Sequence, residues 1–330
     1  MIHIALSVYD PKGTYSRHAG VVIASVLRNT DDDVCFHILH DETLTDENRR
    51  RLEETAGTSP SKSFDKRHGK INFIDVSVSM EKCAGVDFDK ICGRFSKGTL
   101  YRLMMPEIMP PEIDKLIYLD CDIVVTLDIS LLWKYINENM KCSFAGVHEG
   151  RSHSLPKNVI DKTSVTTDKM GLSREYYINA GVLVMNLGSL RTERAEKAEL
   201  FQRAVDYIDH FNPPLLDQDF LNAEYLGDIL YLDPKYNFDP TDEIFDCIYT
   251  IEKIWHFGGH LKPWDALTGT NADMLYWKYL SLTPWKDELW ESLFTAATND
   301  KYYHRHSGGC VKRLKTQIAE EIKNALKFRK

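Results

Sequence analysis

The chain has 330 residues, of which 43% are hydrophobic and 27% are charged, a composition typical of a soluble globular protein. A formal net charge of -8 gives no sign of nucleic-acid binding, and no segment reaches the roughly 18 apolar residues that a membrane-spanning helix requires. Seven scattered cysteines without a CxxC pair argue against a disulfide framework or a zinc ribbon. With no visible secretory signal at the N-terminus, we expect a cytoplasmic protein with reduced thiols.

The first part of the chain alternates short apolar runs with helical patterns. In chain order, the predicted elements are a strand at 2–8, a helix at 16–28, a strand at 34–40, a helix at 45–57, a strand at 71–77, a helix at 99–109 and a strand at 114–125. This alternation predicts parallel strands joined by crossover helices, which is a Rossmann-like α/β sheet.

Beyond residue 150 the alternation loosens. The stretch 151–171 has little periodicity, and we expect a surface lid over a site. The later predicted elements are a strand at 177–187, helices at 191–211 and 217–226, and a strand at 253–259 that ends in glycines. No internal repeat or linker is visible, so the sequence predicts one domain followed by a tail.

The run LIYLDCDIVV at 116–125 is apolar enough for a buried strand but contains Asp120 and Asp122. On one strand the two side chains would point to the same side, about 7 Å apart at ~3.3 Å per residue. Buried carboxylates are tolerated only when they are paired, hydrogen-bonded or bound to a metal, and ligands bind at the carboxyl ends of parallel strands. The pair therefore predicts a cation site. The alternative is that both lie exposed just past the strand, with Cys121 filling the core.

Three later motifs add polar groups that could serve the same site. INAGVLVMNL places Asn179 before small residues that let a ligand approach the backbone, although a strand can also simply tolerate a glycine. LLDQDFLN places Asp217 and Gln218 at a helix start, where any helix favours acids. WHFGGHLKPW places His256 and Lys262 around a flexible turn, a combination suited to a metal-bound phosphate.

The ordered set YLDCD, INAGVLVMNL, LLDQDFLN and WHFGGHLKPW resembles glycosyltransferase family 8. This family contains retaining GT-A-fold enzymes, among them bacterial lipopolysaccharide galactosyl- and glucosyltransferases and glycogenin. The resemblance covers roughly residues 1–270 and implies a Rossmann-like nucleotide-diphospho-sugar transferase fold with a mixed, mostly parallel sheet. It also implies a GT-A domain at 1–270 and a helical C-terminal extension at 271–330.

The resemblance implies a divalent metal held by Asp120, Asp122 and His256, with Mn²⁺ suiting the ligand set somewhat better than Mg²⁺. Lys262 and the backbone of Gly259 would contact the donor diphosphate.

The donor sugar would lie against Asn179, Ala180 and Asp217, and Arg102 would reach the sugar and a phosphate. Gln218 would lie near the face of the anomeric carbon. Because an amide is a poor nucleophile, we expect same-face attack by the acceptor hydroxyl rather than a covalent intermediate.

Two segments depart from the family pattern. In VYDPKGTY the loop after the first strand is longer than usual by a few residues. Tyr15 is still expected to stack on the base, and Asp10 to supply the acid for the nucleoside. After SFAGV, where the family often has an aspartate that faces the sugar, this chain has His148 and Glu149.

The implied activity is the metal-dependent, retaining transfer of glucose or galactose from a UDP-sugar to a glycan or lipid-linked acceptor, such as lipopolysaccharide or another cell-envelope glycan. Three alternatives stand beside it. DCDIV also fits the DxDxV strand of haloacid-dehalogenase-like phosphatases, a nucleotidyltransferase could use the same aspartates, and a non-catalytic protein could bind the sugar nucleotide.

The tail at 311–330 is basic, with a net charge of +5 from seven cations and two glutamates. Its apolar residues recur at helical spacing and predict an amphipathic helix. Such a helix could lie on the anionic cytoplasmic face of a membrane, or it could dock on the protein's own core.

Overall fold

The computed structural model describes residues 1–57, 69–81, 86–93, 95–149, 176–193, 197–240, 252–258, 262–267 and 271–298. The expected lid at 151–171, Gly259 and the tail at 311–330 lie outside these ranges.

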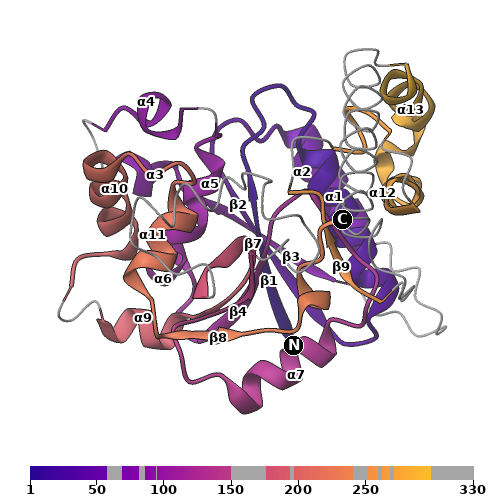
Figure 1. The fold of residues 1–330 in the computed structure, drawn as a ribbon. Helices are drawn as coiled ribbons and strands as arrows, with labels where there is room; N and C mark the ends of the chain where they lie inside the picture. The colour runs from indigo at the N-terminus through magenta and orange to yellow at the C-terminus, as the bar shows by residue number, and fades with distance from the viewer. Residues whose placement is uncertain are drawn as a thin grey trace, which may run out of the picture.

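A seven-stranded sheet forms the centre of the molecule, in the order β3-β2-β1-β4-β7-β6-β8 (Figure 1). Its strands are β1 Ile2–Val8, β2 Val34–His40, β3 Lys70–Asp75, β4 Lys115–Leu119, β6 Phe144–His148, β7 Ile178–Asn186 and β8 Ile229–Tyr231. The first four run parallel, β7 runs antiparallel to β4 and β6, and β8 runs parallel to β6. The predicted mixed, mostly parallel sheet is therefore confirmed.

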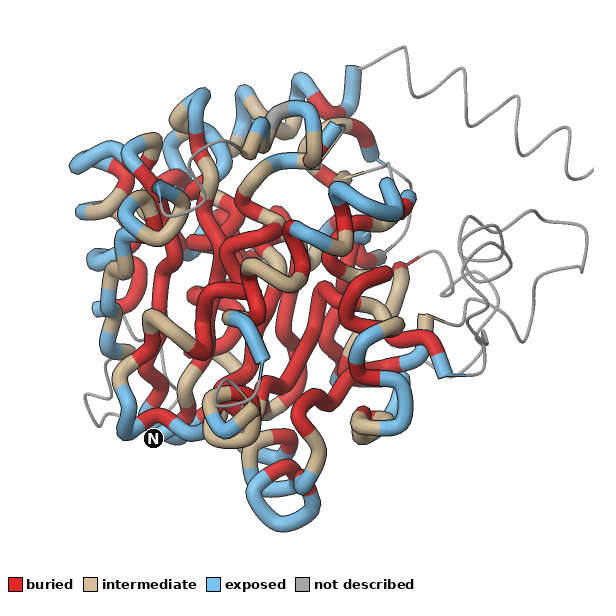
Figure 2. The backbone as a smooth tube through the Cα atoms, turned by 90° about the vertical axis from the view of Figure 1, so that its left-hand side faces the viewer, coloured by how far each residue is buried: buried red, intermediate tan, exposed pale blue. Residues whose placement is uncertain are grey.

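Helices cover both faces of the sheet (Figure 1). On one face lie α1 Ser16–Asn29, α2 Asp46–Gly57, α12 Asn271–Leu280, η5 Pro284–Glu288 and α13 Leu289–Ala297. On the other lie α3 Ser77–Glu81, α4 Phe88–Cys92, α5 Gly98–Tyr101, η1 Arg102–Met104, α6 Met105–Ile108, α9 Leu187–Glu193, α10 Leu200–Phe211 and α11 Asp217–Glu224. The alternate residues of β1 divide between two buried clusters, because side chains alternate along a strand. Figure 2 shows the buried strands enclosed by half-exposed helices.

The strand predicted at 114–125 is two strands. β4 ends at Leu119, the chain turns through Asp120, Cys121 and Asp122, and β5 Ile123–Val125 then pairs antiparallel with β9 Ile254–His256 in a separate two-stranded sheet. The turn directs both carboxylates, which are partly buried, towards basic side chains, because an unpaired charge in the apolar interior would be costly. Cys121 is buried in the core, as the alternative for this run expected, but the two aspartates are not exposed as it also expected.

Two predicted helices are also divided. The helix expected at 99–109 is α5, η1 and α6, and Pro106 lies in the first turn of α6, where its missing N–H costs no hydrogen bond. The helix expected at 191–211 is instead α9, which begins directly after β7, and α10, with residues 194–196 outside the described ranges.

The helices beyond residue 270 pack on the rest of the molecule. α12 and η5 contribute to the same buried cluster as β1, with Ala272, Tyr276, Trp277, Leu280 and Trp285. The remaining helices of the described chain are α7 Ser130–Asn139 and the short η3 Pro234–Tyr236. Among the described residues, no helix combines the length and apolar character needed to cross a bilayer. The division of the chain at residue 270 stays a prediction.

Candidate active site and metal centre

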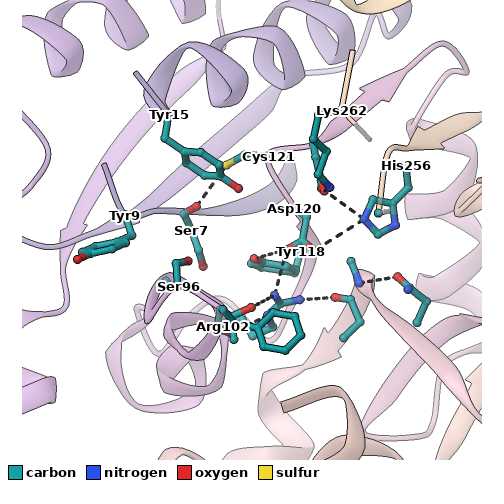
Figure 3. Close-up of a pocket in the computed structure, with 18 residues that line it drawn as sticks. Ser7, Tyr9, Tyr15, Ser96, Arg102, Tyr118, Asp120, Cys121, His256 and Lys262 are labelled. Atoms are coloured by element: carbon teal, nitrogen blue, oxygen red, sulfur yellow. Dashed lines mark hydrogen bonds and ion pairs between the residues drawn. The ribbon is translucent and has the colours of Figure 1, made fainter. Parts of the chain in front are cut away.

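A cleft of about 440 Å³ opens at the carboxyl ends of β1 and β4. The segments after β1, α5 and η1, the turn after β4, the start of β7 and the segment after β9 all contribute to its wall. The lining residues are Ser7, Tyr9, Tyr15, Phe95, Ser96, Gly98, Thr99, Arg102, Tyr118, Asp120, Cys121, Asp122, Asn179, Ala180, Gly181, His256, Gly258 and Lys262. Figure 3 shows Tyr15 and Lys262 on opposite sides of Asp120, with Arg102 below it.

Asp120, Asp122 and His256 converge in this cleft, with one potential ligand atom of each within 4.8 Å of the others. His256 Nε2 lies 3.3 Å from Asp122 Oδ1 and 3.9 Å from Asp120 Oδ2. The backbone fixes this meeting, because β5 pairs with β9 so that Ile123 lies opposite His256. In addition, the N–H of Asp120 donates to the carbonyl of Gly181 at 2.8 Å.

One buried oxygen tests whether these residues fit a cation. Asp122 Oδ1 is buried and has no hydrogen-bond partner, although a buried, unsatisfied carboxylate oxygen is costly. A divalent cation would satisfy it. Two carboxylates and an imidazole are a donor set that Mn²⁺ accepts, with further positions open to phosphate oxygens or water. The three side chains therefore fit the metal that the family resemblance implies.

The charges of the site are strongly coupled. Burial opposes ionisation of Asp122, but Lys262 and His256 outweigh it and hold the pKa of this carboxyl well below its usual range. Burial likewise opposes a charge on His256, but Asp122 and Asp120 raise the pKa of its imidazole above the ordinary value. The Lys262 ammonium contacts both the Asp122 carboxylate and the carbonyl of Phe257. The Lys262 ammonium therefore lies directly beside the carboxylate that would hold a cation.

Two glycines, one on β7 and one just after β9, make room for the His256 ring. A Cβ added to Gly181 would lie 2.2 Å from Cε1 of His256, and one added to Gly258 would lie 2.9 Å from the same atom. Both contacts are closer than real side chains allow. The glycine that follows Ala180 therefore leaves the space that the imidazole ring occupies.

Arg102 lies buried beneath the cleft and joins several groups. Its Nη2 is 3.1 Å from Asp120 Oδ1, its Nε is 3.2 Å from Asp217 Oδ2, and its Nη1 donates to the carbonyl of Ala180 at 2.5 Å. Burial would lower the pKa of Arg102, but Asp120 and Asp217 raise it above its ordinary value. Burial raises the pKa of Asp217 to about 6, against the opposing effect of Arg102.

Asp217 and Gln218 lie behind the cleft and are not among the residues that line it. Gln218 Oε1 accepts from the N–H of Ala180 at 3.0 Å, and its Nε2 donates to the Tyr177 hydroxyl at 3.3 Å. The structure thus brings both residues directly behind Ala180, at the start of α11.

Tyr15 and Asp10 differ in their relation to the cleft. Tyr15 lines the cleft, but the Asp10 carboxylate is buried and accepts from the N–H of Tyr15 at 2.7 Å, from the N–H of Ser16 at 3.0 Å and from Asn48 Nδ2 at 3.1 Å. It caps the start of α1 and shapes the loop that carries Tyr15. Asp10 does not line the cleft.

Sequence reasoning missed Tyr118 and Asn237. The Tyr118 hydroxyl donates to Asp120 Oδ1 at 2.7 Å, and Asn237 Oδ1 lies 2.8 Å from His256 Nδ1. Tyr118 belongs to an apolar strand pattern, and Asn237 follows a short 3₁₀ turn with no motif around it. Only the fold brings them to the candidate metal ligands.

The sequence model of the family described as glycosyl transferase family 8 matches residues 7–268. Since this is most of the chain, the protein belongs to glycosyltransferase family 8 and is a glycosyltransferase. Family membership favours a glycosyltransferase over the three alternatives, which were a phosphatase, a nucleotidyltransferase and a non-catalytic binding protein.

Particular relatives agree with this membership. General stress protein A of Bacillus subtilis is 28% identical over 307 residues, which are 86% of this chain and 95% of that protein. Lipopolysaccharide 1,3-galactosyltransferase of Salmonella typhimurium is 24% identical over 277 residues, 81% of this chain and 74% of the relative. The crystal structure of galactosyltransferase LgtC with donor and acceptor sugar analogues superposes with a TM-score of 0.65 at 21% identity, covering 86% of this chain and 96% of that one. The last comparison supports the GT-A fold.

Proposed function

We propose that the protein transfers a hexose, glucose or galactose, from a UDP-sugar to a glycan acceptor with retention of configuration. The observation that carries the proposal is the convergence of Asp120, Asp122 and His256 beside Lys262, with one buried carboxylate oxygen that accepts no hydrogen bond. The proposed acceptor is lipopolysaccharide or another cell-envelope glycan. The Salmonella relative, named for transfer of galactose to lipopolysaccharide, supports this choice.

In the proposed site, different groups of the cleft contact different parts of the donor. A bound divalent cation, Mn²⁺ or Mg²⁺, would neutralise the negative charge that develops on the departing diphosphate. Lys262 would donate to a phosphate oxygen, and the Gly259 backbone is predicted to lie beside it. Tyr15 would stack on the base. Charged donors in a site closed to water are worth more than the same donors in solution.

Asn179 and Ala180 line the cleft next to the metal ligands and are proposed to contact the hexose. Arg102 is proposed to hold Asp120 and Asp217 in place from below. Gln218 Oε1 is already engaged by the N–H of Ala180, which supports direct attack instead of a glycosyl-enzyme intermediate. In that step the acceptor oxygen bonds to the anomeric carbon, the bond to the diphosphate breaks on the same face, and the diphosphate takes the hydroxyl proton.

The decisive experiment measures UDP release from a panel of UDP-sugars with Mn²⁺, with and without a chelator. We expect slow hydrolysis of one UDP-sugar, and a loss of about 100-fold or more with chelator or in Asp122→Asn. Asp209→Asn is a matched control, because Asp209 is an exposed aspartate on α10. Release that survives both the chelator and Asp122→Asn would contradict the proposed metal site.

We also propose a cytoplasmic location with peripheral membrane contact through residues 311–330. The support is the basic, amphipathic sequence of this segment. In the full-length protein, replacing Lys312, Lys315, Lys323 and Lys327 by glutamate should abolish sedimentation with vesicles that contain phosphatidylserine. Binding that is unaffected by these changes and by 0.5 M salt would contradict an electrostatic contact, since screening at that salt leaves little attraction beyond about 5 Å.

A further inference from the structure

A line of side-chain hydrogen bonds leads from the His256 ring to a carboxylate on another strand. His256 Nδ1 lies 2.8 Å from Asn237 Oδ1, and Asn237 Nδ2 donates to Asn179 Oδ1 at 2.9 Å. Asn179 Nδ2 in turn donates to Glu149 Oε2. The four residues come from the ends of β9, η3, β7 and β6.

A main-chain contact of Asn179 determines which group donates and which accepts in each of these hydrogen bonds. The main-chain N–H of Gly181 can only donate, and it points to Asn179 Oδ1 at 2.8 Å. Turning the Asn179 amide over would bring two donors together there and two acceptors together at Glu149. The carbonyl oxygen of Asn179 therefore faces Gly181 and Asn237.

The orientation of Asn179 in turn determines the orientation of Asn237. Because Asn179 Oδ1 accepts, Asn237 must present its NH₂ group to it, which leaves Asn237 Oδ1 facing His256. An amide oxygen can only accept, so the proton of a neutral His256 must lie on Nδ1. The lone pair is then on Nε2, the atom that faces Asp122 and Asp120.

We infer that Asn237 is a positioning residue that holds His256 as the Nδ1–H tautomer, with Nε2 free to bind the metal, and that Glu149 and Asn179 set the orientation of Asn237. The inference rests on the proposed metal site. Metal-binding histidines commonly donate their second N–H to an oxygen, and loss of such a partner typically costs 10–100-fold in metal affinity. The same line passes through Asn179, so the proposed hexose contact and the proposed metal ligand share one hydrogen-bonded unit.

The test uses two variants of the full-length protein and two readouts that need no turnover. Asn237→Leu removes the acceptor, whereas Asn237→Asp keeps an acceptor for the Nδ1–H group. Titration with Mn²⁺, followed by electron paramagnetic resonance, should show affinity weakened by about 10–100-fold in Asn237→Leu and better retained in Asn237→Asp. The ¹⁵N signals of His256, assigned by their loss in His256→Gln and followed to alkaline pH until the ring is neutral, should report an Nδ1–H tautomer in the wild type.

Controls separate this role from a purely structural one. Asn139→Leu, at an exposed asparagine at the end of α7, should bind Mn²⁺ like the wild type. Urea unfolding of each variant shows whether lost affinity reflects lost folding. If Asp122→Asn fails to bind Mn²⁺, the metal site stands. In that case, wild-type Mn²⁺ affinity in Asn237→Leu would overturn the inference, and so would an Nε2–H tautomer in the wild type. Wild-type affinity in Asp122→Asn would overturn the metal site itself, and the inference with it.

Discussion

At the scale of single residues, Gly181 shows how closely the site is packed. A Cβ at this position would lie 2.2 Å from the His256 ring, so a larger residue does not fit unless the ring moves. We predict that Gly181→Ala displaces the imidazole and weakens Mn²⁺ binding at least about 10-fold, the loss typical when a ligand is badly oriented. Calorimetric titration of the variant with Mn²⁺ checks this.

The matched control is Gly57→Ala, where an added Cβ meets nothing within 4 Å. Gly57 ends α2, far in sequence from the proposed metal ligands. Unchanged Mn²⁺ affinity is expected there. If Gly181→Ala bound Mn²⁺ as tightly as Gly57→Ala, the His256 ring would not occupy the place described.

His37 gives a prediction about pH. It is fully buried on β2, and burial, with a smaller effect of His3, lowers its pKa from 6.5 to about 4. Between those values the unfolded chain binds a proton that the folded chain does not, so stability is present above pH 6.5 and is lost as the pH falls. At pH 5 the loss from this group should be about 2 kcal/mol relative to pH 8.

Urea unfolding at pH 8 and pH 5 measures the effect. His37→Gln should show a drop in unfolding free energy that is smaller than that of the wild type by about 2 kcal/mol. His210→Gln, at an exposed histidine on α10, should retain the wild-type drop. Equal drops in all three proteins would mean that His37 titrates normally in the fold.

Residues of the candidate site could be picked out from the sequence where they form an unusual pattern. Asp120, Asp122, His256 and Lys262 stood out because two carboxylates in an apolar run and a cation after paired glycines are unusual. Asp10 did not follow the expectation, because its carboxylate caps α1 instead of lining the cleft. A sequence shows that an acid follows a strand but not which N–H groups the chain turns towards it.

At the scale of elements, Arg102 joins η1 to three neighbours. It reaches the turn after β4 through Asp120, β7 through Ala180 and α11 through Asp217. We predict that Arg102→Met lowers the unfolding free energy by about 3–5 kcal/mol at pH 8, because it leaves the buried Asp217 carboxylate without a counter-charge. Chemical denaturation measures the change.

The role of Asp217 can be isolated with a second substitution. The double variant Arg102→Met with Asp217→Asn should recover part of the lost stability, since it removes the unpaired charge. The loss in Arg102→Met should also be smaller at pH 5 than at pH 8, because a carboxyl with a pKa of about 6 or higher is largely protonated there. A loss independent of pH would assign the effect to packing alone.

Strands and helices were predicted well where the apolar residues keep one regular spacing along the segment. β1, β2, α1 and α2 follow from clear apolar patterns. The division of 114–125 into β4 and β5 was not predictable, because Ile123–Val125 is as apolar as Lys115–Leu119. What divides them is the partner: β4 pairs with β1 and β7, whereas β5 pairs with β9, more than 100 residues later.

At the scale of the whole molecule, the helices after residue 270 share the core of the preceding fold. Trp285 is 1% exposed, and a Cβ on Gly20 of α1 would lie 2.7 Å from its ring. We predict that Trp285→Ala lowers the unfolding free energy by about 3–5 kcal/mol and leaves a single cooperative transition. Thermal unfolding followed by circular dichroism and by fluorescence should give coincident curves.

Trp290→Ala is the matched control, because Trp290 on α13 is 76% exposed. It should change stability by less than about 0.5 kcal/mol, as surface substitutions usually do. A separate early transition in Trp285→Ala would instead indicate that residues 271–330 unfold as an independent unit.

The pairing of β5 with β9 sets a time at which the proposed metal site can first exist. During synthesis on the ribosome, a chain that has emerged through β7 already contains Asp120 and Asp122 but lacks His256, Lys262 and the strand that brings them together. Such a nascent chain has neither the imidazole ligand nor the ammonium group. On the proposed function, a partly made chain would therefore be unable to hydrolyse sugar nucleotide, since the proposed site is complete only when β9 has paired with β5.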